Sequence, residues 1–197
     1  MKLIFGTSNR GKLREASDIL GPDFELVCPA DMGITEDVEE TGDTLKANSI
    51  LKAEHIFNIA HSACFADDTG LEVDALGGAP GVRSARFAGD EHDFAANRRK
   101  LLEVMKDVPE ELRTARFRCV VTLILEDGQE HFFDGVVEGR IATREMGANG
   151  FGYDAVFIPE AFPRYTMAEL GEDFKNSISH RGMSLRLMAQ WLKENVK

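Results

Sequence analysis

Phe65-Ala66-Asp67-Asp68-Thr69-Gly70-Leu71-Glu72-Val73-Asp74 is the stretch on which the interpretation of this chain depends. The apolar run from Ala60 to Ala66 predicts a buried strand, and Leu71 to Val73 predicts a second short one. Because neighbouring residues on a strand point to opposite faces, Asp67 and Asp68 cannot both face solvent if the strand is central. A carboxylate turned toward a core is costly unless a metal, a cation or hydrogen-bond donors compensate it. The stretch therefore predicts a functional site or, in the simpler alternative, an Asp-Asp-Thr-Gly turn that closes a hairpin.

The segment that follows is irregular. Gly77 to Gly81 is rich in glycine and proline, and Ser84 to Gly89 continues with neither helical nor strand periodicity. A long irregular segment inside a compact domain is usually functional or disordered, and this one is too apolar and too basic to indicate disorder. It therefore favours a site over a plain hairpin. A helix is predicted after it, from Asp93 to Met105.

Length and composition indicate a single domain. The chain has 197 residues, of which 43% are hydrophobic, so we expect residues 1–197 to form one domain, in one or two lobes. There is no apolar run of about 18 residues that would predict a membrane span, and the start of the chain reads as a strand rather than a signal peptide. Cys28, Cys64 and Cys119 are odd in number and far apart, which suits neither disulfides nor zinc. A reducing cytoplasm is the expected compartment.

The net charge limits the possible partners. It is −11, with an isoelectric point near 4.9. A surface that binds nucleic acid should be basic, so a nucleic-acid polymer is not an expected partner. A local cluster of Lys and Arg can still hold a small phosphorylated ligand inside an acidic protein.

The N-terminal segment predicts a phosphate-binding turn. A strand at Leu3 to Gly6 leads into a Gly-containing turn and then a helix from about Lys12 to Leu20. This order aims backbone N–H groups at an anion, with help from the helix dipole. The spacing matches most of a Walker loop, but Leu13 replaces the hydroxyl residue that would hold Mg²⁺. A phosphate loop of another kind is favoured, and the alternative is an ordinary helix start capped by Ser8 or Asn9.

A second, longer helix is predicted from about Thr44 to Ala60, with Asp43 as its N-cap. Asn48, Lys52 and His55 follow at four- and three-residue spacing and therefore share one polar stripe. Most such stripes face water. In the alternative, Lys52 reaches the strand that carries the two aspartates, because that strand follows the helix directly.

The second half of the chain predicts a hairpin and a polar loop. Thr114 to Leu125 and Glu130 to Ile141 are β-rich runs joined by a Glu126 to Gln129 turn. Gly147 to Asp154 is a second glycine-rich loop, followed by a strand at Ala155 to Ile158. The aromatic residues of this loop either stack on a flat base or pack into the core.

A cationic cluster precedes the last predicted helix, Met183 to Asn195. It consists of Lys175, His180 and Arg181. Such a cluster at a helix entrance suits a polyphosphate or a base carbonyl. The alternative for the histidine is a structural role.

Together these segments resemble the inosine triphosphate pyrophosphatase family, which hydrolyses non-standard purine nucleoside triphosphates. The matching pieces stand in family order along the whole chain: Thr7 to Lys12, Glu39-Glu40-Thr41-Gly42, Asp67 to Leu71, Gly77 to Gly89, Gly150-Phe151-Gly152-Tyr153-Asp154, Thr166 to Leu170 and Ser179-His180-Arg181-Gly182. One piece would be weak evidence, whereas seven in order are strong. Thr69 stands where a serine is usual and keeps the hydroxyl. Arg83 stands where a tyrosine is usual, so nothing is carried over to that position.

The resemblance implies an α/β fold: an elongated, twisted, mixed β-sheet flanked by helices, with two lobes and a central substrate cleft. It implies that the protein hydrolyses ITP, dITP and XTP to the monophosphate and pyrophosphate, with Mg²⁺ as cofactor. This reaction would cleanse the nucleotide pool. It also implies a homodimer whose ligand is a small nucleoside triphosphate, with no membrane partner.

The resemblance also implies roles for individual residues. Asp68 would be both a Mg²⁺ ligand and the acceptor of the attacking water's proton, with Asp67 as the fallback base. Glu39 would share the metal, and Glu40 is the less favoured of that pair. The residues expected to hold the triphosphate are Thr7, Ser8, Asn9, Arg10, Gly11 and Lys12. Those expected to line the nucleotide pocket are Thr69, Phe151, Gly152, Tyr153, Asp154, Lys175, His180 and Arg181.

The chemistry agrees with this assignment. Breaking a phosphoanhydride needs charge neutralisation and an aligned water. Mg²⁺ would neutralise phosphate charge, and Lys12 and Lys52 would add to this effect. Donors at His180 and Arg181 would favour a 6-oxo purine over adenine, whose amine would stay unpaired. The rival hypotheses are a P-loop kinase or NTPase that releases or transfers the γ-phosphate, a non-catalytic nucleotide-binding module, and a related enzyme for modified pyrimidine nucleotides.

Overall fold

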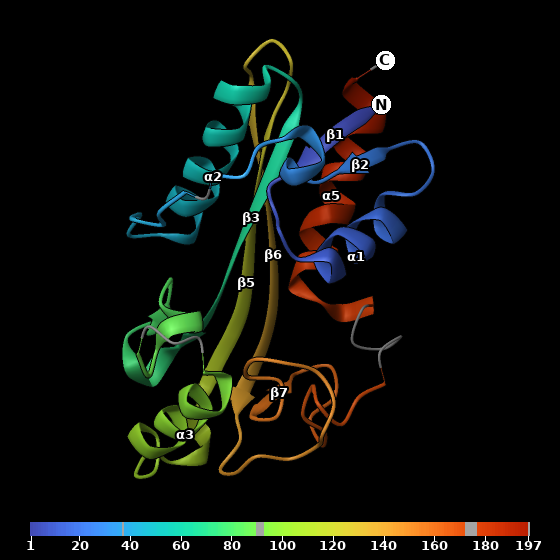
Figure 1. The fold of residues 1–197 in the computed structure, drawn as a ribbon. Helices are drawn as coiled ribbons and strands as arrows, with labels where there is room; N and C mark the ends of the chain where they lie inside the picture. Colours follow the sequence, from blue (N-terminus) through green and yellow to red (C-terminus); the bar gives the residue numbers. More distant parts are fainter. Residues whose placement is uncertain (37, 90–92, 172–176, 197) are drawn as a thin grey trace. The chain divides into compact units, whose positions relative to one another are not determined.

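The computed structural model describes residues 1–36, 38–89, 93–171 and 177–196 (Figure 1). Contacts within the chain divide it into two compact units. Unit 1 comprises Met1–Asp68, Cys119–Gly135 and Arg181–Lys197, and unit 2 comprises Thr69–Arg118 and Val136–His180. Each unit has a hydrophobic core of its own. In the described ranges, no helix is both long and apolar enough to cross a membrane.

The strands of the described residues form a mixed sheet in the order β2-β1-β3-β5-β6-β7, with β4 paired to β3. Its strands are β1 (Lys2–Phe5), β2 (Glu25–Val27), β3 (Cys64–Val73), β4 (Pro80–Gly81), β5 (Thr114–Ile124), β6 (Glu130–Ile141) and β7 (Phe157–Pro159). Strand β1 is parallel to β2 and β3, whereas β4 and β7 run antiparallel to their partners. The helices are α1 (Arg10–Leu20), α2 (Leu45–Ala60), α3 (Phe94–Val104) and α5 (His180–Asn195). A mixed sheet flanked by helices confirms the predicted α/β class.

Unit 1 is a three-layered unit because its central strands alternate their side chains. Leu3, Phe5 and Phe65 belong to one core cluster, which α1 and α5 cover. Ile4 and Cys64 belong to another cluster, which α2 covers from the opposite face. Figure 1 shows the same arrangement within unit 1, with α2 on the left of β3 and α1 and α5 on its right.

Strand β3 is continuous from Cys64 to Val73, which corrects the prediction of two short strands separated by a polar turn. Its first half pairs with β1, where Phe5 lies opposite Phe65, and its second half pairs with β4, where Leu71 lies opposite Gly81. Since both halves are held by a neighbouring strand, the Asp-Asp-Thr-Gly sequence stays extended. The hairpin-turn alternative is therefore excluded.

Several helix starts differ from the sequence prediction. Helix α1 begins at Arg10 rather than at about Lys12. The N-cap of α2 is Thr44, whose Oγ1 accepts the Ala47 N–H at 3.0 Å, and not Asp43. Helix α5 begins at His180 rather than Met183, so Arg181 lies in its first turn. Gly182 is a poor helix former, which is why the sequence pattern placed the start after it. Its buried position in α5 overrides that propensity.

Unit 2 contains α3, the end of the β5–β6 hairpin and β7, which pack around Leu101, Val137 and Phe157. A buried arginine, Arg113, crosslinks this unit. Its guanidinium donates to the main-chain carbonyls of Ile141 and Ala142 at 2.8 Å each, and also to those of Met105 and Val108. Arg113 thus ties the end of β6 to the segment that follows α3.

Candidate functional site

The two adjacent aspartates of β3 point to opposite faces of the unit 1 sheet. Asp67 is two residues after Phe65 and lies on the same face of the strand, which α1 and α5 cover. Asp68 is two residues after Ala66 and lies on the opposite face, which α2 covers. Both are buried, with 2% and 8% of their surface exposed. Each carboxylate is met by cations from the helices on its own side. The prediction that at least one of them turns inward, and needs compensation there, is confirmed for both.

Two side chains from one face of α2 hold Asp68. Lys52 Nζ lies 2.9 Å from Asp68 Oδ1, and Asn48 Nδ2 donates to Asp68 Oδ2 at 3.3 Å. Burial raises the pKa of Asp68 and outweighs the opposing effect of Lys52, and the nearby Glu40 carboxylate raises it further. Burial alone would lower the pKa of Lys52, but Asp68, Asp67 and Glu40 raise it, so the amine stays charged.

A different set of groups holds Asp67. Arg181 Nε donates to its Oδ2 at 3.0 Å, and Lys12 Nζ lies 3.3 Å from the same oxygen. Arg181 also reaches Glu15 at 3.2 Å, which ties α5 to α1. Burial would raise the pKa of Asp67, but Lys12, Arg181 and Lys52 outweigh it and hold this carboxyl well below its usual range. Asp67 is thus a fixed anion, whereas Asp68 is the easier of the two to protonate.

The segment around Glu40 is drawn to Asp68. Glu40 Oε1 contacts Lys52 Nζ at 2.9 Å, so one ammonium bridges two carboxylates. The Gly42 N–H donates to Asn48 Oδ1 at 2.7 Å, which fixes the backbone two residues further on. The side chain of Glu39 is exposed. Among the contacts described, it is Glu40 and not Glu39 that reaches the Asp68 site.

The predicted phosphate loop forms the start of α1 in unit 1. Asn9 caps the helix, because its Oδ1 accepts the N–H groups of Gly11 and Lys12 at 2.8 and 3.2 Å, as one sequence alternative foresaw. Arg10 forms a surface ion pair with Asp31 at 3.3 Å. Thr7 and Ser8 open instead onto a cavity of about 300 Å³ that Lys52 and His55 also line. This cavity therefore connects the loop with the polar stripe of α2, which faces inward rather than into water.

The predicted nucleotide-pocket residues that belong to unit 2 have varied surroundings. Thr69 Oγ1 is buried without a hydrogen-bond partner among the described residues. The ring of His180 stacks on Phe117 with centroids 5.0 Å apart. Phe151 is 60% exposed and meets Phe94 edge to face. Lys175 lies outside the described residues.

The rest of the Gly150–Asp154 loop is tied internally. Asp154 Oδ2 accepts the N–H of Phe151 at 2.9 Å, and the Gly152 carbonyl accepts from Arg98 at 2.9 Å. Tyr153 is buried, and its hydroxyl donates to the Ser84 carbonyl at 2.8 Å. Of the two aromatic residues in this loop, Tyr153 therefore packs into the core, while the ring of Phe151 is mostly exposed.

The donor set around Asp68 fits Mg²⁺. This ion is usually held by one or two carboxylates, keeps several waters and takes the remaining oxygens from substrate phosphates. Asp68 and Glu40 are two carboxylates that already share one cation, Lys52. Among the residues described, no cluster of three or more His, Cys, Asp or Glu side chains could hold a metal. Asp68 and Glu40 therefore fit a metal ion that takes its other ligands from water and from the phosphates of a substrate.

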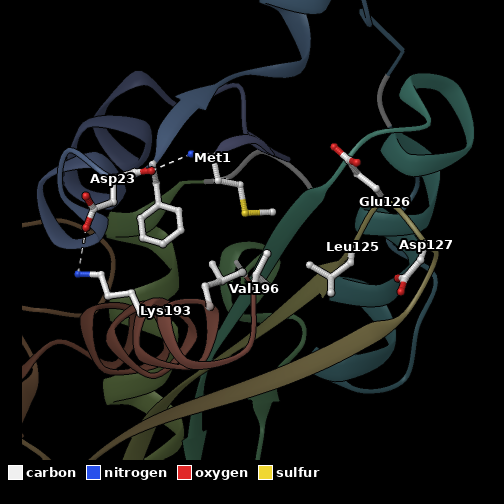
Figure 2. Close-up of a pocket in the computed structure, with 9 residues that line it drawn as sticks. Met1, Asp23, Leu125, Glu126, Asp127, Lys193 and Val196 are labelled. Carbon is white, nitrogen blue, oxygen red and sulfur yellow. Dashed lines mark hydrogen bonds and ion pairs between the residues drawn. The ribbon is translucent and has the colours of Figure 1, made fainter.

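A larger cavity of unit 1, about 630 Å³, lies elsewhere (Figure 2). Apolar side chains such as Phe24 and Leu192 line it, and the ion pair between Lys193 and Asp23 closes one side at 3.5 Å. Glu126 lies at the hairpin turn on its rim. The smaller cavity is the candidate site, because it is lined by Lys52, the cation that pairs with the buried Asp68.

Sequence reasoning missed three participants in this site. Asn48 was predicted only as part of a polar stripe, Glu15 was not predicted, and Glu40 was ranked below its neighbour. The signal for Asn48 was its four-residue spacing from Lys52, which places both on one helix face. Glu15 stands three residues after Lys12 on α1, which is the same kind of signal.

Comparisons with known proteins agree with this picture. The model of the Ham1 family matches residues 3–191. A dITP/XTP pyrophosphatase of Porphyromonas gingivalis is 49% identical over 191 residues, with 97% of each chain covered. One of Bacillus subtilis is 43% identical over 191 residues, with 96% of each chain covered. Among solved structures, the Ham1 protein of Staphylococcus aureus superposes with a TM-score of 0.92 at 36% identity, covering 98% of this chain and 99% of that one.

Proposed function

This chain belongs to the Ham1 family, and we propose that it is a nucleoside triphosphate pyrophosphatase. Its substrates are non-standard purine nucleotides, namely ITP, dITP and XTP, and its products are the monophosphate and pyrophosphate. The resemblance found in the sequence is confirmed by relatives that carry the name dITP/XTP pyrophosphatase along nearly the whole chain. The reaction would cleanse the nucleotide pool, and the free cysteines are compatible with a cytoplasmic setting.

One observation carries the proposal. Asp68 is a buried carboxylate with a raised pKa, and it shares Lys52 with Glu40. Lys52 in turn lines a cavity that the Thr7–Ser8 turn also lines. Hydrolysis of a phosphoanhydride needs such a combination of base, cations and room for phosphate. A module that only binds nucleotides would gain nothing from an acidic group buried at this cost.

Asp68 and Glu40 would hold Mg²⁺, with Glu39 as the substitute for Glu40. When bound, this ion would neutralise charge on the phosphate oxygens and acidify a coordinated water. The residues of the chain supply the rest. Lys52 balances the charge of the two carboxylates before substrate arrives, and with Lys12 it then attracts the triphosphate.

Asp68 is our candidate for the proton acceptor. A general base should titrate closer to neutrality than an ordinary aspartate, and burial moves the pKa of Asp68 in that direction. Asp67 is the poorer base because Arg181 and Lys12 hold its pKa low. Its role is to balance these cations and to hold α1 and α5 against β3.

The nucleotide contacts belong to the same proposal. Thr69 brings a hydroxyl that has no hydrogen-bond partner in the described part of the chain. Phe151 brings an exposed ring for stacking on the base, and His180 a polar group at the start of α5. The Arg181 guanidinium is engaged with Asp67 and Glu15, so its contribution to the base would come through the main chain. A homodimer remains part of the expected assembly.

The proposal is tested by incubating the purified protein with Mg²⁺ and ITP, dITP, XTP, GTP or ATP, while pyrophosphate and orthophosphate are assayed separately. We expect pyrophosphate from ITP, dITP and XTP, little from GTP and ATP, and none after EDTA treatment. Orthophosphate from ATP would point to a P-loop enzyme instead. Binding of ITP without any turnover would leave a binding module.

A further inference from the structure

Asn48 and Lys52 lie on one face of α2, and each contacts both Asp68 and the segment of residues 40–42. Lys52 contacts one oxygen of Asp68 and Asn48 donates to the other, so both oxygens of the carboxylate are engaged. Each of the two residues also reaches the segment before the helix, Lys52 through the side chain of Glu40 and Asn48 through the main chain of Gly42. The four contacts form a closed ring that joins β3, α2 and the 40–42 segment.

The two ends of the Asn48 carboxamide do different work. A main-chain N–H cannot accept a hydrogen bond and a carboxylate cannot donate one, so the amide orientation is fixed by its partners: the oxygen faces Gly42 and the nitrogen faces Asp68. Asn48 is only 1% exposed, so losing either bond would leave a buried polar group unsatisfied. A residue with one donor and one acceptor at this length is required.

Gly42 shows how closely the segment is seated on Asn48. A Cβ added at this glycine would lie 2.7 Å from Asn48 Oδ1 and 2.7 Å from the Cβ of Ala47. The backbone at position 42 therefore lies directly on the start of α2. Because Glu40 is only two residues before Gly42, its position depends on this contact. The contact of Gly42 with Asn48 and the contact of Glu40 with Lys52 together set the distance from Glu40 to Asp68.

We propose that Asn48 is the positioning residue of the site: its carboxamide orients the Asp68 carboxylate and seats the 40–42 segment, so that both carboxylates face one cation site. This inference rests on the proposed function and adds a residue to it. Asn48 touches neither the metal nor the substrate and acts through Asp68 and Glu40. Residues that orient metal ligands in this way typically influence affinity or activity by about 10- to 100-fold.

The chain offers a matched control in unit 2. Asn97 is the fourth residue of α3, as Asn48 is of α2, and it is also 1% exposed. Its Oδ1 accepts the Ala88 N–H at 2.6 Å, and its Nδ2 donates to the Ala85 carbonyl at 2.9 Å. The two asparagines thus have the same structural duty toward a preceding segment, but only Asn48 also binds a carboxylate of the site.

The experiment compares Asn48→Ala with Asn97→Ala in the full-length protein, well below the melting temperature of each. Three quantities are measured: kcat for pyrophosphate release from ITP, Mn²⁺ binding without nucleotide by electron paramagnetic resonance, and the Kd of a non-hydrolysable ITP analogue at saturating Mn²⁺. In Asn48→Ala we expect kcat to fall and the Mn²⁺ Kd to rise, each by about tenfold or more, with the analogue Kd little changed. Asn97→Ala should lose thermal stability but keep both values.

Two results would overturn the proposal. One is an Asn48→Ala protein that is folded and keeps the wild-type kcat and Mn²⁺ affinity, and the other is an equal loss of both in Asn97→Ala. If Asn48→Ala does not fold, Asn48→Asp replaces it, because it keeps the shape and the Gly42 bond but lacks the donor to Asp68. If the wild type releases no pyrophosphate from any purine nucleotide, the proposed function fails separately, and equal Mn²⁺ affinity in wild type and variant would then refute the positioning role by itself.

Discussion

Lys52 Nζ lies 2.9 Å from Asp68 Oδ1, and the pKa of each side chain is above its ordinary value. Burial raises the pKa of Asp68, while three neighbouring carboxylates overcome the effect of burial on Lys52. The pair therefore combines a firmly charged amine with a carboxyl that protonates comparatively easily. Such a pair suits a site in which the carboxyl has to take up a proton beside a cation.

Asp68→Asn should abolish most turnover while leaving the fold intact. The carboxamide keeps the shape of the side chain, and Lys52 keeps Glu40 as its partner. Loss of a general base lowers kcat by roughly 100- to 10,000-fold, whereas stability should change by only about 1 kcal/mol. Pyrophosphate release from ITP and the melting temperature measure the two effects. A variant that retains near wild-type kcat would exclude Asp68 as the base.

Asp67→Asn should show the opposite pattern. Arg181 would lose its buried partner and keep only Glu15, and unpairing a buried charge costs roughly 3 to 5 kcal/mol. The single tryptophan, Trp191, lies on α5 in the same unit, so its fluorescence in urea reports this unfolding directly. Asp68→Asn serves as the comparison. Equal stability of the two variants would contradict the division of roles between the aspartates.

Gly42→Ala should lower activity with a much smaller effect on stability. The new Cβ would lie 2.7 Å from Asn48 Oδ1, so the 40–42 segment has to shift and Glu40 moves with it. We expect kcat to fall by about tenfold and the Kd of an ITP analogue to change little. Gly171→Ala is the control, because a Cβ there would meet nothing within 4 Å. Comparable kinetics in both variants would show that the seat at position 42 is unimportant.

Arg113→Met should destabilise unit 2. Its guanidinium donates to four main-chain carbonyls, and the residue is 2% exposed. Removing these donors leaves buried carbonyls unsatisfied, at about 3 kcal/mol or more in total. Hydrogen exchange of the β6 amides measures the loss locally. The exposed Arg164→Met should stay within about 0.5 kcal/mol of wild type, and a similarly small change in Arg113→Met would refute the crosslink.

Alkaline pH should destabilise unit 1 through Cys64. Burial raises the pKa of this thiol to about 12, from 9.0. The unfolded chain therefore releases the proton first, and the free energy of unfolding falls as pH rises between about 9 and 12, by up to about 1.4 kcal/mol per pH unit. Cys64→Ala should flatten this dependence in urea titrations followed by Trp191. An unchanged slope in the variant would assign the alkaline loss to other groups.

The sequence predicted the short strands of unit 1 because they are continuous apolar runs. In the structure, Leu3 and Phe5 enter one core and Ile4 the other, a division between two faces that the apolar run alone did not predict. The continuity of β3 was not predictable from local propensity, since Asp, Thr and Gly favour turns, and pairing with β1, β4 and β5 keeps them extended.

Most charged residues of the site were predicted from the sequence, whereas the role of its neutral residue, Asn48, was not. Asp68 was visible because a charge on an apolar strand needs compensation, and Lys12 and Lys52 because of their places in the turn and on the helix stripe. Asn48 has no such signal, because a helical asparagine usually faces solvent. Its function depends on what the 40–42 segment and β3 bring to its two ends, and that information lies in the tertiary structure.

The opposite orientation of Asp67 and Asp68 makes the length of β3 as important as its composition. Inserting or deleting one residue between the β1-paired half of the strand and the aspartates would exchange the faces of every side chain that follows. The carboxyl meant for proton transfer would then meet Arg181, and the fixed anion would meet Lys52. Sequence change in this strand is thus confined to substitution, whereas surface turns such as Glu126–Gln129 can grow or shrink.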